Sequence, residues 1–353
     1  MHSFAPDFLE SQAPSPRLVR TLRELGEYKG REEHLEIRSR DTLDVLRRAA
    51  ELESARSSNR MEGIVVRDRR IPELLRWSGR GETRPEREIA GYHRALEATW
   101  QERFEPGFSL GHVLYLHGFL EGFPAFSRFH ADRFRSTDDV TLEAPFGGSR
   151  VAWLAPAPAA EIRHAMEELH RRFEARRQEG VFEPLLLIAT YILDFLLIQP
   201  FPTGNGRMAR LLTHLLLQSE GYEVGWSVSL ERIVEDRLQG YRDAFSESAP
   251  GWHHSLHTLL PWWEYFLGEM LLTAYRELEA WADRTPNVSG YHSERVDATI
   301  ERLLPARFRV EDLLKACPGI SRTTVNRVLR RLRTQGRIVL VRSGRGATWE
   351  KRD

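Results

Sequence analysis

The sequence predicts a mainly α-helical protein with two domains, the second a winged helix-turn-helix domain at the C-terminus. Apolar residues recur at helical spacing through most of residues 41–285. Strand-like pieces interrupt this pattern only around Gly147 and Gly148. A turn-rich stretch at 283–290 is followed by a change in composition, which marks a linker. At roughly 150 residues per domain, 353 residues fit two domains and an extra arm.

The elements are expected in the following order. Residues 1–40 contain prolines and many charges and are expected to form a partly ordered arm, with a short helix at 17–27. Residues 41–285 are expected to form the helical core, including a β-hairpin at 133–156. The amphipathic or apolar patterns predict helices at 41–58, 88–100, 111–121, 160–177, 184–198, 207–219, 230–246 and 261–282.

Residues 290–353 carry the pattern of a winged helix. A short helix is expected at 310–315, and Ser321 is a plausible N-cap for a second helix. In that second helix an apolar stripe follows the spacing i, i+3, i+4, i+7 and consists of Val325, Val328, Leu329 and Leu332. A strand, turn and strand at 338–349 complete a helix-turn-helix with a hairpin.

The charge of the chain is divided unequally along its length. The whole sequence has 51 Lys and Arg against 51 Asp and Glu, which taken alone argues against a nucleic-acid binder. Residues 290–353, however, hold 15 basic and 7 acidic residues, a net of +8, so the remainder has a net of −8. This basic end predicts contact with a polyanion such as DNA.

The expected DNA contacts lie on the second helix and on the wing. Major-groove contacts are expected from Arg322, Thr323, Asn326 and Arg327, and phosphate contacts from Arg342 and Arg345. A winged helix used for dimerisation or target docking remains the alternative.

Other bulk features indicate a cytoplasmic protein. The single cysteine, Cys317, excludes an intrachain disulfide or a Cys-based zinc site and fits a reducing compartment. The first 20 residues carry Asp7 and Glu10 and lack the apolar stretch of a signal peptide. The longest apolar run, 185–198, is interrupted by Asp194 and is short for a bilayer span, so no membrane partner is expected.

The segment 199–210, QPFPTGNGRMAR, has the features of an anion-binding turn. Its prolines end the preceding buried helix, and the Gly204-Asn205-Gly206 tripeptide tolerates positive φ. Successive backbone N–H groups and the start of a new helix then favour a phosphate. Arg207 and Arg210 lie three apart on one helical face and can clamp further oxygens. The alternative is a glycine-rich interhelical turn with two solvated arginines.

This segment resembles the signature of the Fic (Fido) family, H-x-F-x-[D/E]-G-N-G-R-x-x-R. The matching residues are Phe201, Gly204, Asn205, Gly206, Arg207 and Arg210. The resemblance covers most of the chain and includes 88–96, 115–120, the hairpin, 230–241 and 261–267. It implies a Fic helical bundle with a hairpin flap, and transfer of AMP from ATP to a Ser, Thr or Tyr hydroxyl of a protein.

The resemblance also implies roles for individual residues. The motif His would be the general base and the acidic residue would hold Mg²⁺. The Gly-Asn-Gly turn and Arg207 would cradle the phosphates, and Arg210 would hold the γ-phosphate. The flap at 133–156 would dock the target segment as an added strand.

Two positions depart from the family signature. Gln199 replaces the His, and an amide has no accessible pKa with which to take a proton. Thr203 replaces the acidic residue, so Mg²⁺ would be held weakly. Loss of a general base costs roughly 10²–10⁴-fold, so impaired transfer with retained ATP binding is expected. His214 and Asp194 are interpreted as buried structural residues rather than as replacement bases.

Residues 58–63, SNRMEG, resemble the family's inhibitory pattern [S/T]-x-x-x-E-[G/N], with Ser58, Glu62 and Gly63 matching. The resemblance implies that an inhibitory helix over 41–63 brings Glu62 to Arg210. A bidentate pair there would occupy the place of the γ-phosphate. The alternative is a charged helix C-terminus that ends at Gly63.

Three hypotheses of function follow. The first is an ATP-binding Fic protein that is autoinhibited by Glu62, impaired in AMP transfer and acts as a nucleotide-responsive regulator. The second is an active protein adenylyltransferase, and the third is a non-enzymatic DNA-binding or interaction scaffold. The expected partners are an adenine nucleotide and an unidentified protein target; DNA and a second copy of the chain remain open.

Overall fold

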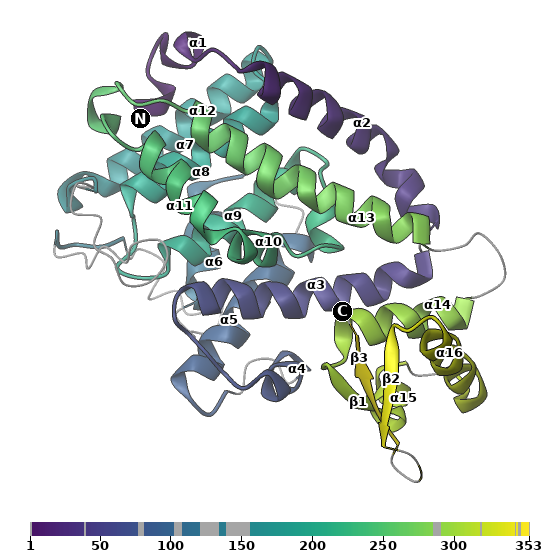
Figure 1. Ribbon diagram of the computed structural model, residues 1–353. Helices are drawn as coiled ribbons and strands as arrows, with labels where there is room; N and C mark the ends of the chain where they lie inside the picture. The colour runs from purple at the N-terminus through teal and green to yellow at the C-terminus, as the bar shows by residue number, and fades with distance from the viewer. Residues whose placement is uncertain are drawn as a thin grey trace. The chain divides into compact units, whose positions relative to one another are not determined.

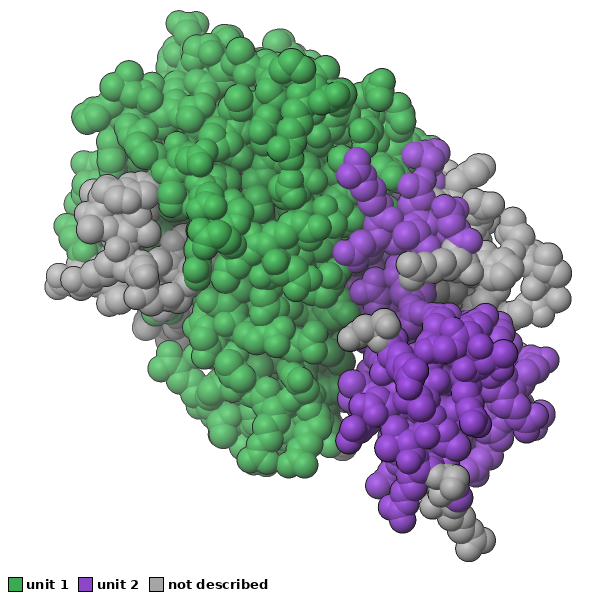
Figure 2. Space-filling model, viewed as in Figure 1, with its two compact units in different colours: residues 1–30, 51–225, 229–275 green, residues 31–50, 226–228, 276–353 purple. Residues whose placement is uncertain are grey.

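The computed structural model describes residues 2–38, 40–76, 81–101, 108–120, 134–138, 156–284, 291–317, 320–342, 344 and 347–352 (Figure 1). It is 73% helical, with a small antiparallel sheet near the C-terminus. The prediction of a mainly helical fold is therefore confirmed. The chain forms two compact units, coloured in Figure 2: unit 1 consists of residues 1–30, 51–225 and 229–275, and unit 2 of residues 31–50, 226–228 and 276–353.

The elements up to residue 226 are, in chain order, η1 (His2–Phe4), α1 (Phe8–Ser11), α2 (Pro16–Arg38), α3 (Arg40–Met61), η2 (Asp68–Arg70), α4 (Ile71–Arg76), α5 (Arg84–Gln101), α6 (Leu110–Leu120), η3 (Ala159–Glu161), α7 (Ile162–Glu179), α8 (Pro184–Ile198), α9 (Asn205–Ser219) and η4 (Val224–Trp226). The remaining elements are α10 (Leu230–Asp236), α11 (Leu238–Ser248), η5 (Trp252–His254), α12 (Leu260–Trp263), the π-helix η6 (Glu264–Leu271), α13 (Leu272–Arg284), α14 (Tyr291–Ala298), the π-helix η7 (Thr299–Leu303), β1 (Arg307–Arg309), α15 (Val310–Ala316), α16 (Arg322–Thr334), β2 (Ile338–Arg342) and β3 (Thr348–Lys351).

Helix α8 lies at the centre of unit 1. It is apolar on nearly every face, as a fully buried helix must be, and it packs against α7 and α9. Pro184 begins it, where the missing N–H costs nothing. It ends at Ile198, because Gln199 adopts the left-handed conformation and Pro200 follows. Helix α9 packs against α8 and α5, and α5 also packs against α6. The turn between α8 and α9 is therefore held between two helices that are themselves packed in the unit.

Of the residues expected to form a partly ordered arm over 1–40, residues 2–30 belong to unit 1. Phe4, Phe8, Leu9 and Leu18 are buried there. Helix α2 also runs well beyond the expected 17–27. These apolar residues dock the segment, because their side chains are buried in unit 1.

A buried hydrogen-bond cluster fixes the N-terminus of the chain to α8. Ser3 donates a short hydrogen bond to Asp194, and its hydroxyl lies 2.8 Å from His257 Nε2. Trp252 Nε1 donates to Asp194 Oδ1 at 2.6 Å. Burial raises the pKa of the Asp194 carboxyl to about 6, although the hydrogen bonds from Ser3 and Trp252 oppose the shift. Asp194 is thus a structural residue, as its apolar surroundings in the sequence suggested.

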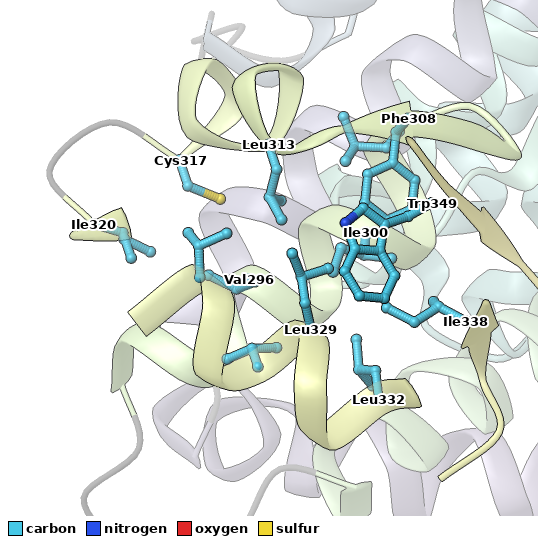
Figure 3. Close-up of a cluster of buried hydrophobic side chains, with 13 residues drawn as sticks. Val296, Ile300, Phe308, Leu313, Cys317, Ile320, Leu329, Leu332, Ile338 and Trp349 are labelled. Atoms are coloured by element: carbon cyan, nitrogen blue, oxygen red, sulfur yellow. The ribbon is translucent and has the colours of Figure 1, made fainter. Parts of the chain in front are cut away.

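Unit 2 has its own apolar core (Figure 3). Its sheet has the order β1-β3-β2 with antiparallel pairs, and Trp349 lies opposite Phe308 and Leu340. Helix α16 buries the predicted stripe of Val325, Val328, Leu329 and Leu332 in this core. The expected wing at 338–349 corresponds to β2 and β3, whereas the expected hairpin at 133–156 lies outside the described residues except for 134–138 and 156.

The raised pKa of Asp194 predicts a pH dependence of stability. Between its ordinary value of 3.8 and about 6, the unfolded chain has lost the proton that the folded chain keeps. Stability therefore falls as pH rises through this window, by roughly 3 kcal/mol from this group. The amide of Asp194→Asn cannot ionise, so the variant does not lose this stability. Its free energy of unfolding, measured in urea and compared with that of the wild type at the same pH, should therefore rise from pH 4 to pH 7. Asp243→Asn, at an exposed site, controls for one lost charge, and parallel pH profiles for the two variants would contradict the assignment.

Candidate functional site

The turn between α8 and α9 supplies the backbone of the candidate site. Gln199 has φ 52° and Gly204 has φ 79°, both in the left-handed region. Asn205 and Gly206 instead form the first turn of α9. Positive φ was expected to be tolerated at Gly204, Asn205 and Gly206, but only Gly204 has a positive φ. The other two residues are helical, because α9 begins at Asn205.

The side chains of Gln199 and Asn205 are hydrogen-bonded within the turn. Asn205 Oδ1 accepts from the N–H of Phe201 at 2.9 Å, and its Nδ2 donates to the Phe201 carbonyl at 2.8 Å. Asn205 Nδ2 also lies 3.3 Å from Gln199 Oε1, while Gln199 Nε2 donates to the Leu196 carbonyl at 3.0 Å. Both ends of the buried Gln199 amide are therefore used to stabilise the turn itself.

Arg135 holds the same turn from the other side. Its Nε donates to the Gln199 carbonyl at 2.8 Å, and its backbone N–H donates to the Pro200 carbonyl at 2.9 Å. Its guanidinium also reaches the carbonyls of Ile198 and Ala157. The bonds to Ile198 and Gln199 satisfy carbonyls that the end of α8 leaves without helical partners. Nothing in the local sequence pattern around Arg135 marks it as a helix cap.

The structure brings Ser58, Glu62 and Arg210 together. Arg210 Nη2 lies 2.8 Å from Glu62 Oε1 and donates to the Ser58 carbonyl at 3.0 Å. Its Nε donates to the Ser58 hydroxyl at 2.8 Å. Burial alone would lower the pKa of Arg210, but the Glu62 charge and hydrogen bond raise it above its ordinary value. The ion pair uses one nitrogen and one oxygen, so it is not the bidentate pair that was expected.

The Glu62 carboxylate lies against the first turn of α9. A Cβ atom built on Gly206 would lie closer than 3.0 Å to Glu62 Oε1 and 3.3 Å from Arg210 Nη1. Only glycine leaves room for a carboxylate here, where the helix N-terminus attracts negative charge. Arg210 Nη1 is buried and has no hydrogen-bond partner among the described residues. The site therefore holds an anionic group and keeps one further donor.

Arg207 is also buried beside carboxylate and amide oxygens. Its Nη1 lies 3.4 Å from Asn59 Oδ1 and 3.6 Å from Glu88 Oε2. Both arginines of the motif are about 6% exposed. The alternative of a turn with two solvated arginines is therefore wrong. Gly63, with φ 74°, follows Glu62 after the end of α3, so the predicted helix end is also present.

The position of the expected metal ligand does not fit a protein-held Mg²⁺. Thr203 is exposed and offers a neutral hydroxyl, and its carbonyl lies 3.3 Å from His117 Nε2. Within the described ranges, no group of three or more His, Cys, Asp or Glu side chains is placed to hold a metal ion. His117 stacks on Phe201 with 3.7 Å between ring centroids, and burial lowers its pKa to about 4. His117 is therefore neutral near pH 7, and its ring packs against the turn through Phe201.

The other histidine near the motif is committed to a buried partner. His214 Nε2 lies 2.9 Å from Glu231 Oε1, and both side chains are almost fully buried. This contact agrees with its interpretation as a core residue. Glu231 carries no sequence signal, because its partners Tyr92 and His214 come from other segments of the chain.

The expected DNA-contacting residues lie on unit 2. Arg322, Thr323, Arg327 and Arg342 are exposed and Asn326 is half-buried, whereas Arg345 lies outside the described residues. Arg327 Nη2 donates to the Ser293 hydroxyl at 3.3 Å.

Comparisons with known proteins agree with this architecture. Residues 107–217 match the model of the Fic/DOC family, so the chain contains a domain of that family. The structure is similar to that of a Fic family protein from Desulfovibrio desulfuricans, with 21% identity and a TM-score of 0.57 over 96% of this chain and 97% of that one. No curated protein matches the chain.

Two further solved structures share the fold. A Fic domain-containing signalling protein from Bacteroides thetaiotaomicron is 19% identical, with a TM-score of 0.59 over 75% of this chain and 99% of that one. A fragment of Fic-1 from C. elegans that carries one substitution is 17% identical, with a TM-score of 0.53 over 74% of this chain and 71% of that one. In the part of the chain that the structure describes, no helix has the length and apolar character needed to cross a membrane.

The contact between Gly206 and Glu62 can be tested by adding one methyl group. Gly206→Ala should cost about 1–3 kcal/mol of unfolding free energy, because the new Cβ displaces the Glu62 carboxylate. In a Glu62→Gly background the cost should vanish and a helix-propensity gain of up to about 1 kcal/mol should appear. Urea unfolding of the four proteins measures this difference.

The matched control is Gly118→Ala in α6, where an added Cβ meets no atom within 4 Å. This substitution should have the same effect with and without Glu62. An equal effect of Gly206→Ala in both backgrounds would contradict the placement of the carboxylate.

Proposed function

We propose that this chain binds ATP with its phosphates at the N-terminus of α9, and that Glu62 competes with the nucleotide. The observation that carries the proposal is the position of the Glu62 carboxylate between Gly206 and Arg210. A carboxylate and a terminal phosphate need the same donors, namely a guanidinium and the N–H groups at a helix start. The choice of ATP follows from membership in the Fic/DOC family and from the signature resemblance.

The residues around α9 fit a phosphate chain. Arg210 keeps one buried donor without a partner, and Gly206 leaves a cradle that a side chain would fill. Arg207 lies in the same first turn, beside Gly204. With Glu62 in place the cradle is filled, so the nucleotide binds only to the fraction of molecules in which Glu62 has moved away. The apparent affinity is reduced by that fraction.

We further propose that the chain transfers AMP poorly and acts as a nucleotide-responsive regulator. Gln199 cannot accept a proton from a target hydroxyl, and its amide is already hydrogen-bonded within the turn. Thr203 supplies no carboxylate for a metal ion. The anion-binding part of the motif is kept while the proton-transfer part is replaced, which favours binding over catalysis.

Glu62→Gly should tighten ATP binding about tenfold, because the competing charged hydrogen bond is removed. Isothermal titration calorimetry measures the dissociation constant of ATP for each protein. Arg210→Ala serves as the control and should weaken binding in both backgrounds. Identical ATP affinity of wild type and Glu62→Gly would contradict competition by Glu62.

The same proteins separate regulation from catalysis. Incubation with α-labelled ATP and Mg²⁺ should label no protein with Glu62→Gly alone. Adding Gln199→His and Thr203→Asp should restore labelling by orders of magnitude, since a general base contributes roughly 10²–10⁴-fold. Equal labelling without these two changes would favour the alternative of an active adenylyltransferase, and absence of ATP binding in every variant would favour a non-enzymatic scaffold.

DNA binding by unit 2 is a second candidate function, favoured by the face of α16 opposite its buried stripe. That face exposes Arg322, Thr323, Arg327, Arg330 and Arg333. The element order α14-β1-α15-α16-β2-β3 supports the winged-helix interpretation.

Replacing Arg342, the expected phosphate contact, by Ala should weaken binding of duplex DNA. It should also reduce the slope of log affinity against log salt by about 1, since each lost phosphate contact contributes about 0.9. Fluorescence anisotropy over a salt series measures the slope. Arg307→Ala, at an exposed site on β1 that pairs with Glu350, is the control. An affinity independent of salt would contradict phosphate contact.

A further inference from the structure

Helix α10 contacts the helix that carries the inhibitory residues. On the outside, Arg232 Nε lies 3.2 Å from Glu53 Oε2, and Arg60 forms two hydrogen bonds of 2.5 and 2.8 Å with Glu235. Glu53 and Arg60 belong to α3. The Arg60 side chain is 44% exposed, and such surface ion pairs contribute little to stability. They place the two helices side by side without fixing them firmly.

A buried contact joins the same two helices. Ser54 of α3 donates to the Ser229 hydroxyl at 2.8 Å, and both residues are fully buried. Ser229 is the N-cap of α10, where its hydroxyl accepts from the N–H of Arg232 at 3.1 Å. Since Ser54 and Ser58 lie four residues apart, they share one face of α3, and Ser58 is a direct partner of Arg210. The position of Ser54 therefore sets the position of the Arg210 contacts.

Glu231 lies at the centre of this buried network. Its Oε1 accepts from the Tyr92 hydroxyl at 2.6 Å and lies 2.9 Å from His214 Nε2, while its Oε2 lies 3.4 Å from the Ser229 hydroxyl. Burial raises the pKa of Glu231, but the charge of His214 and hydrogen bonds from His214, Ser54 and Tyr92 together lower it to about 2. The carboxylate is thus ionised at neutral pH.

A buried carboxylate tolerates few arrangements, because each lost partner leaves an uncompensated charge. The partners of Glu231 come from α5, from α9 and from the N-cap of α10. His214 follows Arg210 by one turn of α9, so the network fixes α3 relative to the helix that carries the phosphate-binding arginines. A fully satisfied polar network of this kind specifies one packing over its alternatives.

We propose that Glu231 is a positioning residue that, through Ser229 and Ser54, holds α3 in the register in which Glu62 covers the anion site. This inference rests on the proposed competition between Glu62 and ATP. Loosening the network releases Glu62 without removing it, so α10 sets the strength of the autoinhibition.

Two substitutions test the inference. Ser54→Ala removes the contact on the α3 side and leaves the Glu231–His214 pair intact, so the protein should fold. Glu231→Gln removes the charge at the centre of the network. Each should tighten ATP binding about fivefold in the presence of Glu62, the effect of one net hydrogen bond, and should change nothing in a Glu62→Gly background. Asp236→Asn, on the same helix at an exposed site that pairs within α10, is the control.

Hydrogen exchange gives a readout that does not depend on the nucleotide. The amides of residues 51–61 should exchange about fivefold faster in both variants, while those of α8 keep their wild-type rates. Three outcomes would overturn the role of Glu231. The first is an equal change of ATP affinity with and without Glu62, and the second is unchanged hydrogen exchange in α3. The third is tighter ATP binding by Ser54→Ala but not by Glu231→Gln. If Glu62→Gly itself leaves ATP affinity unchanged, the proposed function fails, and the exchange rates still decide whether Glu231 positions α3.

Discussion

The guanidinium of Arg210 is buried in unit 1, and a buried charge needs a partner of opposite sign. In the structure that partner is Glu62, which follows helix α3. Because the carboxylate must reach the first turn of α9, residue 206 has to be a glycine, and Ser58 has to face the guanidinium. The packing of the end of α3 in unit 1 is thus tied to the buried charge of Arg210.

The turn before α9 is held by hydrogen bonds that need no titratable side chain at residue 199. Gln199 occupies a left-handed backbone position, and its amide bridges Leu196 and Asn205. Arg135 binds the carbonyls on the other side of the turn. The geometry of the turn therefore does not depend on the histidine that the family signature places at residue 199.

The sequence was informative where a contact is local and uninformative where it is not. The all-apolar α8, the proline-glycine turn and the stripe of α16 repeat within a few residues, so their periodicity reveals them. Ser3 and Asp194 are 191 residues apart, and Tyr92 and Glu231 are 139 apart. No periodic pattern connects such pairs, which is why the docked N-terminus and the Glu231 network were missed. The proximity of Glu62 to Arg210 was expected only through a family resemblance. The ion pair is single-point because the Ser58 hydroxyl accepts from Nε of the guanidinium, the nitrogen that a second carboxylate oxygen would otherwise bind.

Arginine side chains are accommodated differently in the two units. In unit 1, buried arginines such as Arg207 and Arg210 are matched to carboxylates, because desolvation leaves no alternative. On α16, Arg322, Arg330 and Arg333 are exposed, and side chains at such positions can be solvated by water instead of being paired. A buried arginine matched in this way adds no net charge to its surroundings, whereas an exposed cluster leaves a field that attracts a polyanion. The excess of +8 over residues 290–353 therefore accumulates where burial does not require compensation. The same burial argument constrains unit 1, because a change that moved the Glu62 carboxylate away would leave the buried Arg210 guanidinium without its carboxylate partner.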